Sequence, residues 1–202
     1  MTKAASPYNG ALTREQFLFP EMRIAAKLLC EGYSPDDAVQ RIVDDNLFQF
    51  PTERMTGNIA KVCIRRLKAL PEDALIASVA NDPAGTAKQV CLYAIMRDNR
   101  LVRDFMITVI GEKYRVQDMH FNASDLNVFF MRLQEQDDKV ASWSDSTIKK
   151  IKSVMRRILI ENEYIYEKGS NELQPVLISG KLESAIIACG DKASLPAFNR
   201  FI

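Results

Sequence analysis

The segment SDSTIKKIKSVMRRILI, residues 144–160, has the pattern of an amphipathic helix. At 100° per residue its apolar residues share one face, and its basic residues cover much of the opposite arc. Ser144 is suited to begin the helix, because a serine side chain accepts a hydrogen bond from a free N–H group of the first turn. The basic residues are Lys149, Lys150, Lys152, Arg156 and Arg157. The segment predicts a basic helix that runs to about Glu163.

Helix signals also occupy the rest of the chain, where prolines and short polar residues precede apolar repeats. Thr13–Gln16 resembles a capping box, and Ser34 is followed by a proline and two acids, which favours a helix start. We expect helices over 13–31 with a kink or a break at Pro20, and over 35–47, 51–70, 72–79, 84–97, 100–112, 124–139 and 181–188.

One region has strand character. The triplets at 164–166 and 176–178 are rich in β-branched and aromatic residues, and residues 168–171 between them are typical of a turn. The sequence thus predicts an all-α fold in two helical halves, 1–81 and 82–202, each with a helix-turn-helix-like unit. In the second half, a short β-hairpin would follow the basic helix as a wing. No linker marks the boundary, and the halves can form one compact unit.

Composition excludes several classes of protein. The 202 residues are 47% hydrophobic and 26% charged, which is typical of a globular domain. With 27 basic and 26 acidic residues, the net charge of +1 excludes a uniformly basic nucleic-acid binder. Residues 1–10 lack the apolar core of a signal peptide, and no apolar run approaches the roughly 20 residues of a membrane span. We expect a soluble, cytoplasmic monomer that does not bind membranes.

Signatures of catalysis and metal binding are absent. The four cysteines never form a C-x-x-C motif, and His120 is the only histidine, so zinc-finger spacing cannot be assembled. The cysteines lie in apolar helical contexts typical of free thiols. There is no phosphate-binding glycine loop and no nucleophile elbow. His120 lies in an expected loop and is a weak candidate for a general base. We therefore expect no enzyme activity, cofactor or metal.

A second basic segment covers residues 52–70, which carry five basic residues and one acid. Four of the basic residues fall on a common helical stripe, and the apolar residues occupy the other side. The stripe consists of Arg54, Lys61, Arg65 and Lys68. The preceding segment, 31–45, holds five acids and one base. A basic helix would thus follow an acidic one. The net charge of the whole chain is close to zero and does not reveal this local separation of charge.

The order of elements in the C-terminal half is that of a winged helix-turn-helix: a helix, a turn near Trp143, the basic helix and the hairpin. In that interpretation the basic helix enters the major groove, and Lys168 at the tip of the hairpin contacts backbone phosphate. The alternative is that both basic helices present solvated outer faces, as amphipathic helices commonly do.

The whole chain resembles the BrxA family, small core proteins of type 1 BREX bacteriophage-exclusion systems. The resemblance depends on the openings Phe17–Glu21 and Phe50–Arg54, the break Gly32–Ser34, the entry Trp143–Lys150 and the late Pro175–Leu177. It implies an all-α fold with two helix-turn-helix units, double-stranded DNA binding and a place in a multi-component defence complex. Other components would supply the catalysis. A fold similarity to RNA-binding antitermination factors keeps RNA open as a ligand.

We therefore expect a non-catalytic, double-stranded DNA-binding accessory protein with modest sequence preference. If each basic helix makes about three phosphate contacts, the slope of log K against log salt should be roughly −5. Two alternatives stay open. One is a protein–protein adaptor that docks on other BREX components, and the other is an RNA-binding protein.

Overall fold

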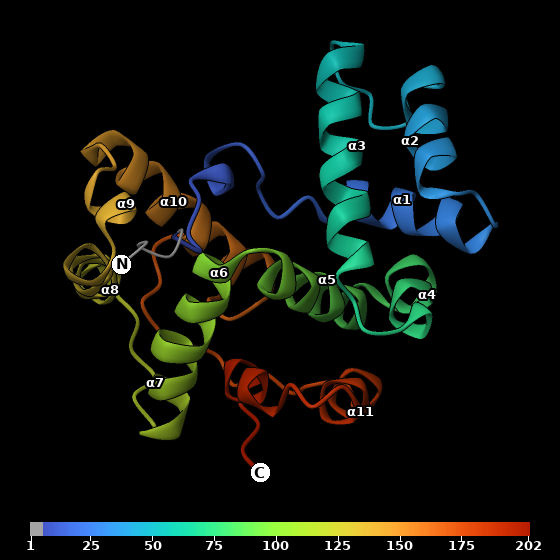
Figure 1. Cartoon of the computed structure of the whole chain (residues 1–202). Helices are drawn as coiled ribbons and strands as arrows, with labels where there is room; N and C mark the ends of the chain where they lie inside the picture. The colour runs from blue at the N-terminus through green and yellow to red at the C-terminus, as the bar shows by residue number, and fades with distance from the viewer. Residues whose placement is uncertain (1–5) are drawn as a thin grey trace, which may run out of the picture. The chain divides into compact units, whose positions relative to one another are not determined.

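The structure is a computed structural model that describes residues 6–202 (Figure 1). Residues 1–5, which open the segment where no signal peptide is expected, lie outside the described residues. The chain divides into two compact units, neither of which is continuous in sequence. The 17–98 unit comprises Phe17–Asp98 and Ile178–Gly190; the 99–177 unit comprises residues 6–16, Asn99–Leu177 and Asp191–Ile202.

The 17–98 unit is a cluster of helices with α1 at its centre. Its elements are α1 (Phe19–Cys30), α2 (Pro35–Asp44), α3 (Glu53–Lys68), α4 (Asp73–Asn81), α5 (Ala84–Asp98) and α11 (Gly180–Ala188). Helix α1 packs against α2, α3, α4 and α5, while α11 packs against α4. Helices α2 and α3 lie side by side (Figure 1). Every residue from Val90 to Met96 of α5 is buried, so α5 is a core helix.

The 99–177 unit combines two long helices, α8 and α10, with several shorter ones. Its elements are η1 (Ala11–Thr13), α6 (Arg100–Phe105), η2 (Met106–Gly111), α7 (Glu112–Arg115), α8 (Ala123–Gln136), α9 (Asp138–Ala141), α10 (Asp145–Glu161) and η3 (Lys192–Phe198). The short η1 packs against α10 and buries Leu12 completely. The π-helical η2 packs against η3, where a Cβ atom on Gly111 would lie 2.9 Å from Cβ of Pro196. Only glycine permits this approach.

The expected helix over 13–31 is wrong in its first third. Thr13 ends η1 instead of capping a helix, and α1 begins only at Phe19. Leu18, with a φ of 59°, is in the left-handed region just before α1, and Pro20 lies in the first turn. A proline is tolerated there because its missing N–H group would have had no partner in the helix. The two predicted caps at Ser34 and Ser144 are confirmed, since their hydroxyls accept from the N–H groups of Asp37 and Thr147.

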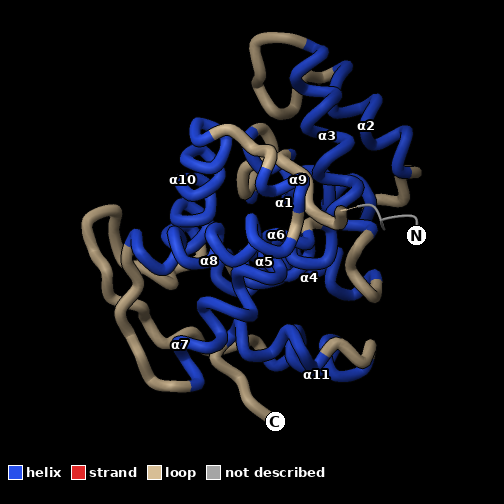
Figure 2. The backbone as a smooth tube through the Cα atoms, turned by 60° about the vertical axis from the view of Figure 1, so that its left-hand side comes forward, coloured by secondary structure: helices blue, strands red, loops and turns tan. Residues whose placement is uncertain are grey.

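The hairpin expected at 164–178 does not form as predicted, and the described residues contain no strand (Figure 2). The chain does double back, but Ile165 pairs through an isolated bridge with Leu173, which is buried. On its other side, the Leu173 N–H group donates to the Met119 carbonyl at 2.7 Å. The isolated bridges of the described residues join His120 with Glu172 and Ile165 with Leu173 rather than involving 176–178, and Leu177 is 88% exposed. Leu173 is buried where it pairs with Ile165, and the pattern of apolar residues in the sequence did not predict this burial.

The all-α class is confirmed for the described residues. The compact units cut the chain differently from the expected division into 1–81 and 82–202, because α5 packs against α1, α3 and α4. Cys63 and Cys91 are buried free thiols, whereas Cys30 and Cys189 are exposed free thiols. No helix in residues 6–202 combines the length and the apolar character that crossing a membrane requires.

Candidate nucleic-acid interface

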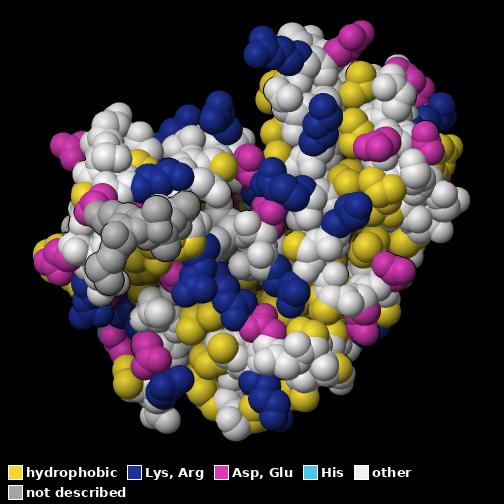
Figure 3. Space-filling model, viewed as in Figure 1, with side chains coloured by type: hydrophobic (Ala, Val, Ile, Leu, Met, Phe, Trp, Pro, Cys, Tyr) yellow, Lys and Arg dark blue, Asp and Glu magenta, His cyan; other side chains and the backbone are white. Residues whose placement is uncertain are grey.

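Helix α3 presents the predicted basic stripe to solvent. Arg54, Lys61, Arg65 and Lys68 are all exposed, and Figure 3 shows basic side chains spaced along this helix. On the opposite side Ile59, Cys63 and Leu67 are buried, with Leu70 just beyond the last turn. The stripe therefore faces outward because the apolar face of α3 packs against α1 and α5.

The cations of α3 are not equivalent. The Arg65 guanidinium donates to both carboxylate oxygens of Asp98, at 2.7 and 2.8 Å. Arg66, which contributes to the local charge in the sequence, is only 1% exposed and donates to the Phe17 carbonyl at 3.3 Å. The Asp98 carboxylate lies 3.9 Å from Nε of Arg66 as well. Asp98 thus compensates cationic charge on α3, whereas Arg54, Lys61 and Lys68 are exposed and form no ion pair with a carboxylate among residues 6–202.

The loop between α2 and α3 is held by polar side chains at both of its ends. Thr52 caps the helix by accepting from the Met55 N–H group at 3.2 Å. The Asn46 side chain accepts from the Phe50 N–H group and donates to the Phe50 carbonyl, both at 3.1 Å. These bonds fix the entry to the basic stripe.

Helix α10 divides its basic residues between two environments. Lys149, Lys150 and Arg157 are exposed, and Arg157 donates to the Gln16 side chain. Lys152 and Arg156 are half-buried on the flank that faces the start of α8 and the loop at 168–171. No basic residue of α10 forms an ion pair with a carboxylate within the described part of the chain.

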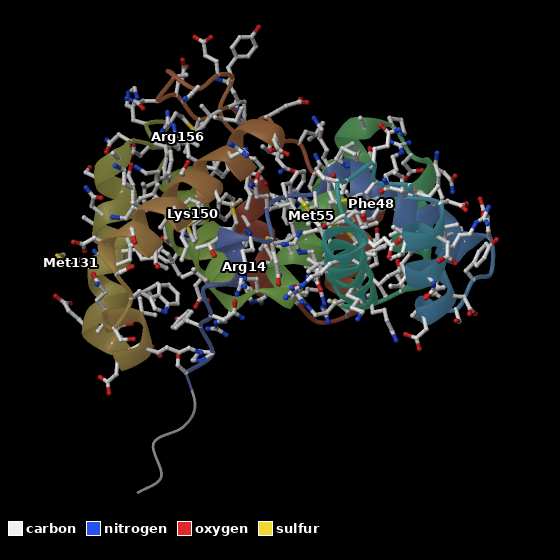
Figure 4. The ribbon with its side chains drawn as sticks, turned by 90° about the horizontal axis from the view of Figure 1, so that it is seen from above. Arg14, Phe48, Met55, Met131, Lys150 and Arg156 are labelled. Carbon is white, nitrogen blue, oxygen red and sulfur yellow. The ribbon has the colours of Figure 1, made fainter. Side chains whose placement is uncertain are left out.

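The half-buried cations bond to neutral groups. Lys152 Nζ donates to the Asn127 side chain at 2.8 Å and lies 5.3 Å from the centre of the Phe130 ring. Burial lowers the pKa of Lys152, and the carboxylate of Asp145 opposes this shift. The Arg156 guanidinium donates to the carbonyls of Lys168 and Ser170 and to the Asn171 side chain (Figure 4). Arg156 therefore positions the loop that carries Lys168.

Lys168 is exposed at the tip of this loop. Its backbone carbonyl accepts from Arg156 at 3.3 Å, so the main chain at this position is held by α10. The structure places Lys152, Arg156 and Lys168 around one groove of the 99–177 unit. Arg54, Lys61, Arg65 and Lys68 belong to the other unit.

Three residues near these cations were missed in the sequence. Arg14 follows η1, which packs on α10, and its side chain is exposed. The Thr13–Gln16 segment was interpreted as a capping box, so no signal suggested a surface role. Asn127 and Asn171 are likewise brought to the half-buried cations by tertiary contacts alone.

The structure offers no candidate metal centre within residues 6–202, since no three histidine, cysteine or acidic side chains gather closely enough. His120 is exposed in the loop before α8, and its backbone forms an isolated bridge with Glu172. The acids of α2 are exposed along one helix rather than converging, and Arg41 pairs with Asp45 at 2.8 Å.

Comparison with known proteins identifies the family. The family model BrxA matches residues 6–190. A protein named BREX protein BrxA from Bacillus cereus (strain H3081.97) is 34% identical over 185 residues, covering 91% of this chain and 92% of its own. Another protein of that name, from Paramagnetospirillum magneticum (strain ATCC 700264 / AMB-1), is 26% identical and covers 88% of both chains.

A solved structure shares the fold. The crystal structure of an uncharacterized protein from Magnetospirillum magneticum superposes with a TM-score of 0.80 at 23% identity, over 96% of this chain and 98% of that one. The helical architecture, the match of the family model along nearly the whole chain and the similarity to named relatives agree, and this chain belongs to the BrxA family.

Proposed function

We propose that this chain is a non-catalytic, double-stranded DNA-binding component of a BREX phage-defence system. The observation that carries the proposal is that α3 and α10 each bury an apolar face and present a basic face to solvent. Exposed arginine and lysine side chains supply phosphate contacts, which dominate the affinity of most DNA-binding proteins. The names of the related BREX proteins support the cellular context.

We propose that both basic helices belong to helix-turn-helix-like units. In the 99–177 unit, α9 and α10 are separated by residues 142–144 only, and α8 packs against α9. In the 17–98 unit, α2 packs against α3 across a longer loop. The loop at 163–178 would take the place of a wing, although it lacks strands, because Arg156 holds its tip beside α10.

A salt-dependent titration tests this function. Fluorescence anisotropy of a labelled duplex of about 20 base pairs is measured at several potassium chloride concentrations, with unlabelled single strands and RNA as competitors. We expect micromolar or tighter binding and a slope of log K against log salt of roughly −5, from about six phosphate contacts. No binding at low salt, or a slope near zero, contradicts the proposal. Stronger competition by RNA than by the duplex makes RNA the ligand.

The acidic face of α2 favours a second candidate, a protein–protein adaptor within the defence complex. Asp36, Asp37 and Asp44 are exposed on this helix, and Asp45 is exposed directly after it. Reversing charge on each surface separates the candidates. Lys149→Glu with Lys150→Glu should abolish duplex binding under the first proposal. Asp36→Lys with Asp44→Lys should leave duplex binding intact and, under the second, abolish capture of other BREX components by the tagged protein.

A further inference from the structure

A groove lies between the start of α8, the middle of α10 and the loop at 168–171, all within the 99–177 unit. Its volume is about 630 Å³, which is large enough for a nucleotide-sized group. Its polar lining includes Ser124 and Asn127 on α8, Lys152 and Arg156 on α10, and Lys168 and Asn171 in the loop.

The lining carries three cations and no acid. Asp125 of α8, which follows Ser124, is engaged elsewhere: it accepts from the Asn122 N–H group at 2.7 Å and lies 3.0 Å from Nζ of Lys113. Asp118, which lies in the loop before α8, bonds to the same lysine at 2.8 Å. Both carboxylates therefore pair with Lys113, which compensates one of their two charges, and neither of them lines the groove. Glu167 and Glu172 flank the 168–171 loop, and both are exposed outside the groove lining.

The groove is built by bonds that leave the charge of its cations uncompensated. Arg156 holds the 168–171 wall through neutral oxygens, and Lys152 is held by Asn127 and the Phe130 ring. Each of these two cations loses part of its hydration without gaining a carboxylate partner. Burial of this kind disfavours the charged form, and the lowered pKa of Lys152 agrees with it. An anion in the groove would offset that cost.

We propose that this groove is a phosphate-binding site that holds one backbone phosphate of bound DNA. The inference rests on the proposed DNA-binding function and extends it, since it adds α8 to the contact surface and joins α8, α10 and the 168–171 loop in one phosphate site. Lys152 and Lys168 contact the phosphate from opposite walls. Arg156 acts as a positioning residue for Lys168, while Ser124 and Asn171 supply neutral hydrogen bonds.

The site can be tested without DNA. Side-chain NMR of uniformly labelled full-length protein follows the Nζ resonances of Lys152 and Lys168 during titration with inorganic phosphate, then with a 5′-phosphorylated dinucleotide, at constant ionic strength. Saturable shifts at both lysines, together with a rise in the pKa of Lys152, are expected. The variant Lys152→Gln with Lys168→Gln should abolish the phosphate response. Lys192→Ala removes an exposed lysine of the same unit outside the groove and serves as the matched control.

Duplex binding gives the second readout. The double variant should lower the magnitude of the salt slope by about 1 to 2, and the control should leave the slope unchanged. Hydrogen exchange at 168–173 establishes that the loop of the double variant keeps its structure. If loop protection is lost in the double variant, the single variant Lys168→Gln is used instead, because it leaves the Lys152 and Arg156 bonds in place. A salt slope for Lys168→Gln that is smaller in magnitude than that of the wild-type protein supports the site, and an unchanged slope contradicts it.

The outcomes separate the site from the proposed function. Absence of duplex binding by the wild-type protein contradicts the proposed function. In that case the phosphate titration alone decides whether the groove binds phosphate. Duplex binding with no saturable lysine shift and an unchanged slope overturns the groove. Saturable phosphate binding, together with an unchanged salt slope in the double variant, shows that the bound phosphate does not come from DNA. The groove is then a site for a free phosphorylated compound.

Discussion

Helices α3 and α10 carry similar charge in the sequence but differ in what the fold does with it. On α3, Asp98 compensates Arg65 at 2.7 Å and lies near the buried Arg66. On α10, the half-buried Lys152 and Arg156 bond to amide and carbonyl oxygens and gain no carboxylate. The comparison teaches that the local count of basic residues overstates the available charge of α3. The same count does not reveal that some basic residues of α10 are exposed to solvent while others hold a neighbouring loop or helix.

The Asp98 carboxylate is the point where α3 is most vulnerable. Its side chain is only 9% exposed, and removing it leaves the buried Arg66 and the paired Arg65 without their shared counter-charge. We expect Asp98→Ala to lower the free energy of unfolding by about 3 kcal/mol, because the buried Arg66 loses part of its counter-charge. Urea denaturation measures the effect. Asp45→Ala, which removes a pair with the exposed Arg41, is the control and should cost less.

Neutralising exposed cations tests whether both helices contact DNA. Lys149→Gln with Lys150→Gln on α10, and Arg54→Gln with Lys61→Gln on α3, should each reduce the salt slope by about 2. Each pair should weaken duplex binding roughly 30-fold at about 0.15 M salt, through the loss of counterion release at two contacts. Arg65→Gln should change the slope less than Lys61→Gln does, since Asp98 already compensates Arg65. Equal slopes for these two single variants would contradict the distinction drawn for α3.

Substitutions of the neighbouring Arg156 and Arg157 on α10 should have different effects. Arg156→Gln removes the bonds to the 168–171 loop and should cost about 1 to 2 kcal/mol of stability, as expected for charge-assisted hydrogen bonds. Hydrogen exchange should show lost protection at 168–173. Arg157→Gln should leave protection there unchanged and reduce only the salt slope. Identical behaviour of the two variants would show that Arg156 does not position the loop.

Acid should weaken both units through similar lysine–aspartate pairs. The hydrogen bond from Lys181 lowers the pKa of Asp82, and that from Lys113 lowers the pKa of Asp118. Each contribution to stability is complete above the unfolded pKa of about 3.9 and is lost as pH falls through the lower folded value. Asp82→Asn and Asp118→Asn should each cost less than about 1 kcal/mol near pH 6, because both pairs are partly exposed.

A pH series of urea denaturation checks this expectation. The stability difference between each variant and the wild-type protein should shrink as the pH falls below about 4. The Asp82 variant should show the larger difference, since its carboxylate is 25% exposed against 44% for Asp118. A difference that stays constant over the whole series would mean that these carboxylates contribute no charge interaction.

Helical periodicity and capping residues were enough to predict the all-α class and the outward basic stripes of α3 and α10. They also placed the caps at Ser34 and Ser144. These properties depend on residues within one or two turns of each other, so the local order of side chains contains them. The start of α1 was missed because Thr13–Gln16 resembles a helix start, although the chain there forms η1 and packs on α10.

Tertiary contacts decided the rest. Asp98 reaches Arg65 from 33 residues away, Lys152 reaches Asn127 across 25, and Leu173 takes the partner expected of residues 176–178. No period links such residues, because each pairing depends on how separate helices and loops pack and which polar groups that packing buries. Local sequence therefore specifies which residues are basic and which way each helix faces. Only the packed structure determines which of those charges are compensated, which hold a loop, and which line a groove.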